Sequence, residues 1–218
     1  MLGTLAAMGA LGAVLCSCNI ITPAMYLLVG KPKLDAEHKI ADRPTVVFVD
    51  DRANAIEQNS RRTRQAIAEK VSAELMIEKL VETTIRPADA MAVSRQRDRQ
   101  GAILAMDEIG EAVGAEQVIY VEMLSFRGTV DGMPRPNASC RVRVIDVINR
   151  KRLFPAPDAL EPSRLVQVFG LAANPELYRS RRGRRQLEES LANQLGDRIA
   201  KLFYKHVPDE LGSRLGPQ

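Results

Sequence analysis

Apolar residues follow two patterns along this chain, short unbroken runs and stripes at helical spacing. Residues 45–49 (TVVFV) form a β-branched apolar run, which is typical of a buried strand. Residues 61–80 contain neither Gly nor Pro, and Ile67, Val71 and Leu75 recur there at every fourth position. This spacing predicts a helix whose apolar face packs against a sheet.

The middle of the chain predicts three shorter elements. We expect a strand at residues 81–86 (VETTIR) and a helix at residues 87–95, because Pro87 suits the first turn of a helix. A further helix is expected at residues 101–114, with Gly114 as its C-terminal cap.

The second half of the chain is rich in strand patterns. They lie at residues 116–128, 138–148, 151–154 and 164–170. In the second of these, Cys140 and Val142 alternate with Arg141 and Arg143, as expected of a half-exposed antiparallel strand. Helical patterns follow, a short one that starts at Pro175 and a long one at residues 184–206. The apolar stripe of the long helix consists of Leu187, Leu191, Leu195, Ile199, Leu202 and Phe203.

Together these elements predict one α+β domain at residues 45–207, followed by a flexible tail at residues 208–218. Helices connect the early strands, whereas hairpins connect the later ones. We therefore expect a mixed, mainly antiparallel sheet of about five to six strands packed with helices.

Several stretches carry a resemblance to a group of bacterial proteins. They read TVVFVDD, RTRQAIAEKVSAELM, TTIRPADAM, AVGAEQVIYVEML and VRVIDVINRKRLF. In this order they resemble the domain of envelope lipoproteins of the CsgG-like, penicillin-binding-protein-activator and TolB N-terminal type. Asp146 with Asn149 and Arg150 fits the strand, aspartate, tight turn and return strand of that group. The resemblance covers residues 45–154 and implies a non-catalytic envelope domain that binds protein partners.

The N-terminal segment is apolar and carries no charged side chain from residue 2 to residue 30. Residues 5–15 fit the apolar core of a secretory signal. The next four positions, Leu15-Cys16-Ser17-Cys18, resemble a bacterial lipobox, in which the last cysteine is lipidated. We therefore expect a signal peptide at residues 1–17, a lipidated Cys18, and a tether at residues 18–44. Acyl chains on Cys18 would then hold the protein on the membrane.

Other interpretations of the N-terminal segment stay open. Cys16 fits less well as the acceptor because the large Leu15 would precede it. Residues 1–4 lack the basic residues of a signal peptide, and residues 2–21 are long enough to span a bilayer as an uncleaved helix. Lys31 and Lys33 would then favour a cytoplasmic C-terminal side. A buried N-terminal helix is the third interpretation.

Two further features depend on the lipoprotein interpretation. By resemblance to Gram-negative lipoproteins, Asn19 after the acceptor, in place of Asp, favours the outer membrane and a domain that faces the periplasm. Cleavage and lipidation also leave Cys140 without a cysteine partner, so we expect no intramolecular disulfide. Cys140 is expected to be a small buried hydrophobe.

The sequence offers few groups for catalysis. His38 and His206 are its two histidines, and neither has a Cys or a second His at metal-ligand spacing. Asp50 and Asp51 follow a buried strand, where carboxylates could hold a divalent metal. A loop pair that binds Arg52 or caps a turn is the simpler interpretation. We expect no enzymatic activity, no cofactor and no metal.

Arginine supplies most of the net charge of +4 and the isoelectric point near 9.1. It clusters at residues 61–64, 95–99 and 179–185, and Gly183 in the last cluster predicts a loop before the final helix. The arginines of this last cluster are Arg179, Arg181, Arg182, Arg184 and Arg185. Trp is absent and aromatic residues make up 4% of the chain, so we expect no nucleic-acid partner.

An anionic envelope surface, such as lipid headgroups, is the expected partner of residues 179–185. A solvated loop is the alternative for them and the preferred interpretation of the other two clusters. The sequence thus favours a non-catalytic, membrane-anchored envelope lipoprotein that acts as an adaptor or assembly component with an envelope protein partner. The alternative is a membrane-tethered binder of anionic lipid or polymer with an uncleaved N-terminal anchor. No feature indicates a particular oligomeric state.

Overall fold

The computed structural model describes residues 32–56, 60–98, 104–128, 136–170 and 175–208. Its contacts divide the chain into two units, of which Ala36–Tyr204 holds the sheet and the helices. In the other unit, the described residues Leu34 and His206 pair through backbone hydrogen bonds of 2.8 and 3.0 Å. None of the helices in the described ranges has the length and the apolar character needed to cross a membrane. The predicted signal peptide and most of the predicted tether lie outside the described residues.

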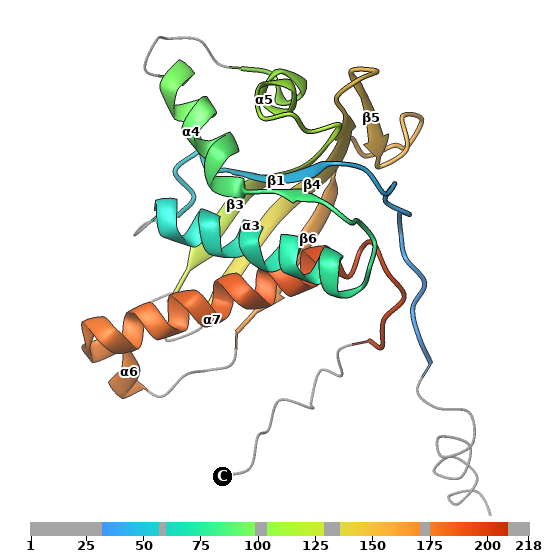
Figure 1. The fold of residues 1–218 in the computed structure, drawn as a ribbon. Helices are drawn as coiled ribbons and strands as arrows, with labels where there is room; N and C mark the ends of the chain where they lie inside the picture. Colours follow the sequence, from blue (N-terminus) through green and yellow to red (C-terminus); the bar gives the residue numbers. More distant parts are fainter. Residues whose placement is uncertain (1–31, 57–59, 99–103, 129–135, 171–174, 209–218) are drawn as a thin grey trace, which may run out of the picture. The chain divides into compact units, whose positions relative to one another are not determined.

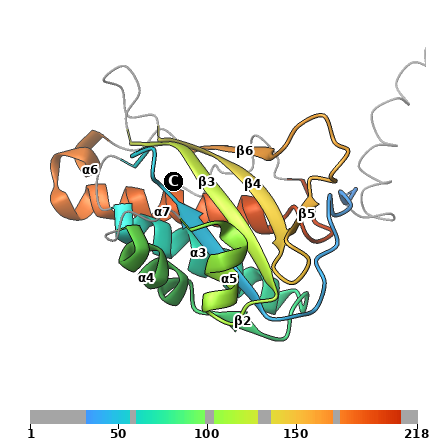
Figure 2. The same ribbon diagram turned by 90° about the horizontal axis from the view of Figure 1, so that it is seen from above.

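A six-stranded mixed sheet lies at the centre of the 36–204 unit (Figures 1 and 2). Its strands are β1 (Thr45–Asp50), β2 (Thr84–Ile85), β3 (Gln117–Arg127), β4 (Asn137–Asp146), β5 (Lys151–Phe154) and β6 (Arg164–Phe169). They follow the order β2-β1-β3-β4-β5, and β6 also pairs with β4. β1 is parallel to β2 and β3, whereas β4 is antiparallel to β3, β5 and β6. This arrangement confirms the predicted α+β class and the mixed, mainly antiparallel sheet.

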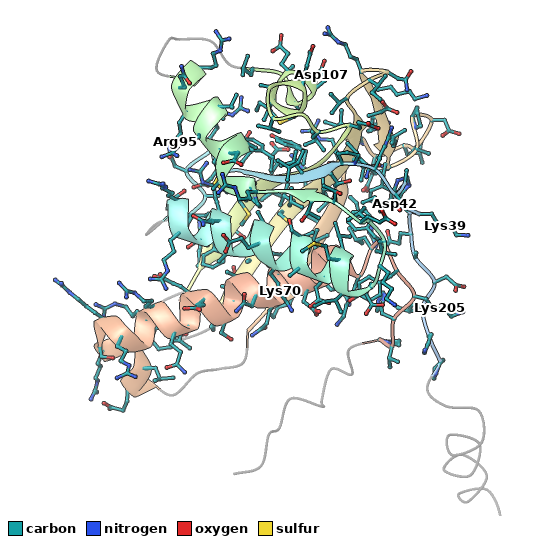
Figure 3. The ribbon with its side chains drawn as sticks, in the orientation of Figure 1. Lys39, Asp42, Lys70, Arg95, Asp107 and Lys205 are labelled. Atoms are coloured by element: carbon teal, nitrogen blue, oxygen red, sulfur yellow. The ribbon has the colours of Figure 1, made fainter. Side chains whose placement is uncertain are left out.

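Two long helices cover one face of the sheet (Figure 1). The described helices are α3 (Ser60–Ile77), α4 (Pro87–Asp98), α5 (Met106–Ala112), α6 (Pro175–Arg179) and α7 (Arg181–Ala200). The predicted stripe of α3 is completely buried, as is Leu195 of α7. α3 and α7 run side by side in the same direction (Figure 1), because Arg62 lies beside Glu189 and Lys70 beside Gly196. Figure 3 labels Lys70 on α3, beside α7. A Cβ at Gly196 would lie 2.8 Å from the Lys70 Cβ, so glycine permits the close approach.

The opposite face of the sheet is only partly covered. Gly110 of α5 packs against the side chains of Val118 and Val147, and α4 contacts β1. Figure 2 shows these short helices on the β1 side of the sheet. No described helix covers this face over β4 and β6, where side chains alternate between buried and partly or fully exposed. This alternation confirms the half-exposed pattern predicted for β4.

Several predicted boundaries are wrong at the ends of elements. α7 begins at Arg181 because the Ser180 Oγ accepts the N–H of Gly183 at 2.9 Å. It ends at Ala200, although Leu202 and Phe203 beyond it are still buried, as their place in the predicted stripe requires. The apolar stripe in the sequence indicates which side chains are buried, and these continue beyond the last helical hydrogen bond.

The shorter elements differ in the same way. α5 begins at Met106, because the Glu108 carboxylate accepts the N–H of Ala105 at 2.9 Å and caps the helix there. Gly114 follows α5 with a φ of 74°, in agreement with its predicted capping role. β2 spans only Thr84–Ile85, which is shorter than predicted.

The last residues of the predicted tether belong to the compact unit. The backbone N–H groups of Glu37 and His38 donate to the Leu202 carbonyl at 2.8 and 3.1 Å. Ile40 packs against the core, and Arg43 pairs with a carboxylate at the end of β4. The folded unit therefore begins at Ala36, before the predicted start at residue 45.

Candidate functional site

The predicted lipidation site, Cys18, lies outside the described residues. Its lipidation therefore stays a prediction from the sequence. Among the described residues, the predicted arginine segment and the strand-end carboxylates remain as candidates, and the tertiary structure adds a third region on the sheet.

The arginine segment at residues 179–185 is helical, which corrects the predicted loop. Arg179 ends α6, and the other arginines lie at the start of α7. Gly183 does not interrupt the helix but is buried within it. A Cβ at this position would clash with the carbonyl group of Leu177, so the glycine allows α6 to fold back against α7. Gly183 therefore indicates a close helix contact that a local pattern cannot distinguish from a loop.

The arginines of this segment differ in their contacts. The Arg179 Nη1 lies 2.7 Å from a Glu176 carboxylate oxygen, and the Arg184 Nη1 donates to the Tyr178 carbonyl at 2.6 Å. Three arginines are exposed and form no hydrogen bond or ion pair with the described part of the chain: Arg181, Arg182 and Arg185. Within the described residues, the positive charge of this segment is therefore only partly neutralised.

A shallow groove of about 280 Å³ lies between α3 and α7. Arg62 and Arg185 line it together with acidic residues of both helices. The Arg62 Nη2 lies 3.4 Å from a Glu189 carboxylate oxygen, and both side chains are 56% exposed. The fold thus brings the arginine cluster of α3 next to that of α7, although the two clusters lie more than 100 residues apart in the sequence.

Asp50 holds together a group of side chains at the end of β1. Its carboxylate accepts the Tyr120 hydroxyl at 2.8 Å and binds the Arg52 Nε at 2.9 Å. The Arg143 guanidinium lies over the Tyr120 ring at 4.6 Å and 3.6 Å from a Glu122 carboxylate oxygen. Burial and the neighbouring Asp50 raise the pKa of Tyr120, so this hydroxyl remains a hydrogen-bond donor. The charges in this group are satisfied by one another.

Asp51 stabilises the loop that follows β1. One carboxylate oxygen accepts the N–H groups of Ala55 and Ile56 at 2.7 and 3.2 Å, and the other accepts the Ser60 hydroxyl at 2.5 Å. These contacts agree with the interpretation of the two aspartates as a loop pair. Within the described ranges, no group of three or more His, Cys, Asp or Glu side chains is arranged to hold a metal ion.

A partly apolar open face, which was not predicted from the sequence, lies over β4 and β6. Arg141 pairs in register with Leu165 on this face, and Phe169 lies further along β6. Leu165 is 43% exposed and Phe169 72% exposed. We call this region the open face and define it by Arg127, Arg141, Leu165, Gln167 and Phe169. The period-2 spacing of Val166 and Val168 was the signal that could have placed Leu165, Gln167 and Phe169 on the other side of the strand.

Asp146 braces the turn between β4 and β5. It accepts the backbone N–H and the side-chain amide of Asn149 at 2.8 and 3.0 Å, and it pairs with Arg43 at 3.2 Å. Burial alone would raise its pKa, but the contacts with Asn149 and Arg43 outweigh burial and lower the pKa to about 2. Asp146 therefore stays charged, and the predicted tight turn is present with Arg150 at a φ of 48°.

The two remaining candidate residues, His38 and Cys140, lie among core side chains. His38 lies 5.3 Å from the ring of Phe154 and 6.4 Å from that of Phe203, and burial lowers its pKa. Cys140 is completely buried, as predicted, and burial raises the pKa of its thiol. A neutral, buried thiol is a poor nucleophile.

Comparisons with known proteins identify only distant structural likenesses. No protein-family model and no curated protein matches this chain. It is similar to the PelC dodecamer from Paraburkholderia phytofirmans at 14% identity and a TM-score of 0.44, over 79% of this chain and 96% of that chain. It is also similar to the hypothetical protein CT253 from Chlamydia trachomatis at 18% identity and a TM-score of 0.37, over 74% of this chain and 98% of that chain.

A third likeness is to the lipoprotein GNA1162 from Neisseria meningitidis. The identity is 15% and the TM-score 0.34, over 73% of this chain and 96% of that chain. Likenesses at these TM-scores carry no argument about function. The resemblance to CsgG-like and related lipoproteins therefore stays a prediction from the sequence.

Proposed function

We propose that this chain is a bacterial envelope lipoprotein, anchored through Cys18, whose α+β domain is a non-catalytic adaptor for an envelope protein. The observation that carries the proposal is the sequence Leu15-Cys16-Ser17-Cys18 at the end of an apolar, uncharged segment. Its finer parts, namely the outer membrane, the periplasmic side and the kinship with CsgG-like domains, rest on Asn19 and on the sequence resemblance.

The open face supports the adaptor part of the proposal. It combines exposed apolar side chains, Leu165 and Phe169, with an exposed guanidinium, Arg141. Aromatic and arginine side chains are enriched at the centres of protein interfaces. In contrast, Asp50 and Asp51 are nearly buried and already have partners. The open face therefore has the exposed side chains that a protein partner could contact, whereas the two strand-end carboxylates are not accessible to a substrate.

The anchor is tested by fatty-acid labelling in cells. Cys18→Ser is expected to abolish labelling and to leave an unprocessed precursor. Cys16→Ser is the matched control and should label and mature normally. Labelling that persists in Cys18→Ser would contradict the lipoprotein assignment, and a native protein that retains residues 1–17 would favour the uncleaved anchor.

The adaptor surface is tested by photo-crosslinking in cells. A photoreactive residue at Phe169 is expected to form a discrete adduct with one envelope protein. The control position is Ile77 at the end of α3, which is also exposed, at 67%, but lies outside the open face. Adducts of equal number and yield from both positions would argue against a specific surface.

A second candidate function is a membrane-tethered binder of anionic lipid or polymer. The observation that favours it is the set of exposed arginines at the start of α7 that have no ion pair within the described ranges. This function is compatible with the first, because the open face and the arginine segment involve different residues.

A further inference from the structure

The tertiary structure joins two arginine clusters that are far apart in the sequence. Arg61 and Arg62 lie in the first turn of α3, and α7 begins with Arg181 and Arg182. Because the two helices run in the same direction, both clusters lie at the same end of the helix pair (Figure 1). Arg185 shares the groove between the helices with Arg62. We call this set of five exposed residues the arginine surface: Arg61, Arg62, Arg181, Arg182 and Arg185.

These arginines lie where they contribute little to the stability of the fold, since even the Arg62–Glu189 ion pair is exposed. The amino end of a helix carries a partial positive charge, which favours acidic side chains in the first turn. Neither α3 nor α7 has an acidic residue there. At α7 the basic side chains therefore add their charges to a positive helix end, whereas at α3 the Asp51 carboxylate, which accepts the Ser60 hydroxyl, offsets part of this charge. Such an arrangement is unfavourable for the isolated domain, so stability does not explain it.

The nearby acidic residues neutralise the surface only in part. Glu189 pairs with Arg62, and Glu176 pairs with Arg179. Arg61, Arg181 and Arg182 form no ion pair with the described part of the chain. The surface therefore has unused hydrogen-bond donors and an excess of positive charge, and guanidinium groups fit phosphate oxygens well.

We infer that the arginine surface binds the phosphate groups of anionic lipid headgroups, so that this end of the domain lies against the membrane. A membrane fits because the donors are spread over two helices and form no closed pocket. The inference rests on the proposed membrane anchor only for the nearness of the lipid. The link from Cys18 to Ala36 can span about 60 Å when extended. A link of this length does not fix the orientation of the domain, whereas binding of the arginine surface to headgroups would fix it.

The experiment uses the full chain, reconstituted in phosphatidylcholine vesicles with or without phosphatidylglycerol. A fluorophore is placed on Gln186→Cys, because Gln186 is exposed and lies beside Arg182 and Arg185. Energy transfer to headgroup-labelled lipid reports how close this site is to the membrane. The control fluorophore is on Glu82→Cys, which is exposed and lies beyond the opposite end of α3. The native Cys140 is buried and should not react, Cys18 is blocked where it is acylated, and Cys16 and Cys18 are changed to Ser in the unlipidated chain.

Transfer from the Gln186 position is expected to be high only in vesicles with phosphatidylglycerol, and to fall as salt is added. Arg181→Gln with Arg182→Gln should lower the ratio of docked to undocked domain about thirtyfold. The matched control, Lys39→Gln with Lys79→Gln, removes the same charge from exposed positions outside the arginine surface and the open face, and should leave this ratio unchanged.

Several results would overturn the inference. The first is equal energy transfer from the Gln186 and Glu82 positions. The second is an equal loss of docking in both double variants, and the third is no loss of docking in Arg181→Gln with Arg182→Gln. Displacement by inorganic phosphate that exceeds displacement by chloride at equal ionic strength would assign a soluble phosphate ligand instead. These results are independent of the anchor proposal. An unlipidated chain that inserts through residues 2–21 would give the same energy-transfer readout. Fatty-acid labelling, in contrast, tests Cys18 alone.

Discussion

The two halves of α7 have opposite relations to the fold. Its C-terminal half places Leu191, Leu195 and Ile199 in the core, where they are between 0% and 2% exposed. Its N-terminal half begins with arginines that project from the domain and, at three positions, have no partner in the described chain. One helix therefore combines a half that stabilises the domain with a half whose charges are available for binding. Substitutions in the two halves should have effects that differ in size and in sign.

The largest expected effect is in the core half. Leu195→Ala should lower the free energy of unfolding by about 2–5 kcal/mol, because it removes a fully buried side chain and leaves a cavity. Urea unfolding followed by circular dichroism measures the change. Leu160→Ala is the control, since Leu160 is fully exposed and should change stability little. A neutral Leu195→Ala would show that this half of α7 is not part of the core.

Gly183→Ala tests whether the arginine half is positioned by packing. The new Cβ would clash with the Leu177 backbone, which cannot move without displacing α6, so we expect a loss of about 1–3 kcal/mol. Unfolding of the variant is compared with that of Asn193→Ala, an exposed position on the same helix. Equal stability of the two variants would mean that α6 does not hold the start of α7.

Asp146 provides a buried charge to compare with the exposed charges of α7. Its pKa is lowered from 3.8 to about 2, so it stabilises the fold above pH 4, and this contribution is lost as the pH falls through its folded pKa. The shift corresponds to about 2 kcal/mol. Unfolding free energies measured between pH 5 and pH 2 should show this loss. In Asp146→Asn this loss of stability between pH 5 and pH 2 should be absent. If the variant shows the same pH dependence as the native chain, Asp146 is not its cause.

The smallest effect is expected in the arginine half, with the opposite sign. Arg181→Glu with Arg182→Glu should raise the free energy of unfolding by about 0.5–2 kcal/mol at low salt, because acidic residues suit the first turn of a helix. The gain should shrink as salt is added. The same variant should lose docking to anionic vesicles. A destabilised variant would show that these arginines serve the fold, and the contrast between the two halves would fail.

Much of the fold was predictable because its patterns are local. The spacing of Ile67, Val71 and Leu75 predicts a helix that packs against a sheet. The alternation of apolar and basic residues around Cys140 predicts a strand with one buried face. The turn at Asn149 follows from a few adjacent residues in the same way. Boundaries were predicted less well, since Ser180 and Glu108 set the ends of helices through single hydrogen bonds.

The candidate sites were predictable only in part. The sequence alone determined that residues 179–185 are strongly basic and that Asp50 and Asp51 end a buried strand. The pairing of Asp50 with Arg52 is local, but only the tertiary structure decided that Asp50 also accepts the hydroxyl of Tyr120, 70 positions away. It also decided that Arg61 and Arg62 lie beside the start of α7, because the shared direction of α3 and α7 arises from long-range packing. Local patterns in a sequence report burial and secondary structure, whereas the pairing of distant charges depends on how those elements are assembled.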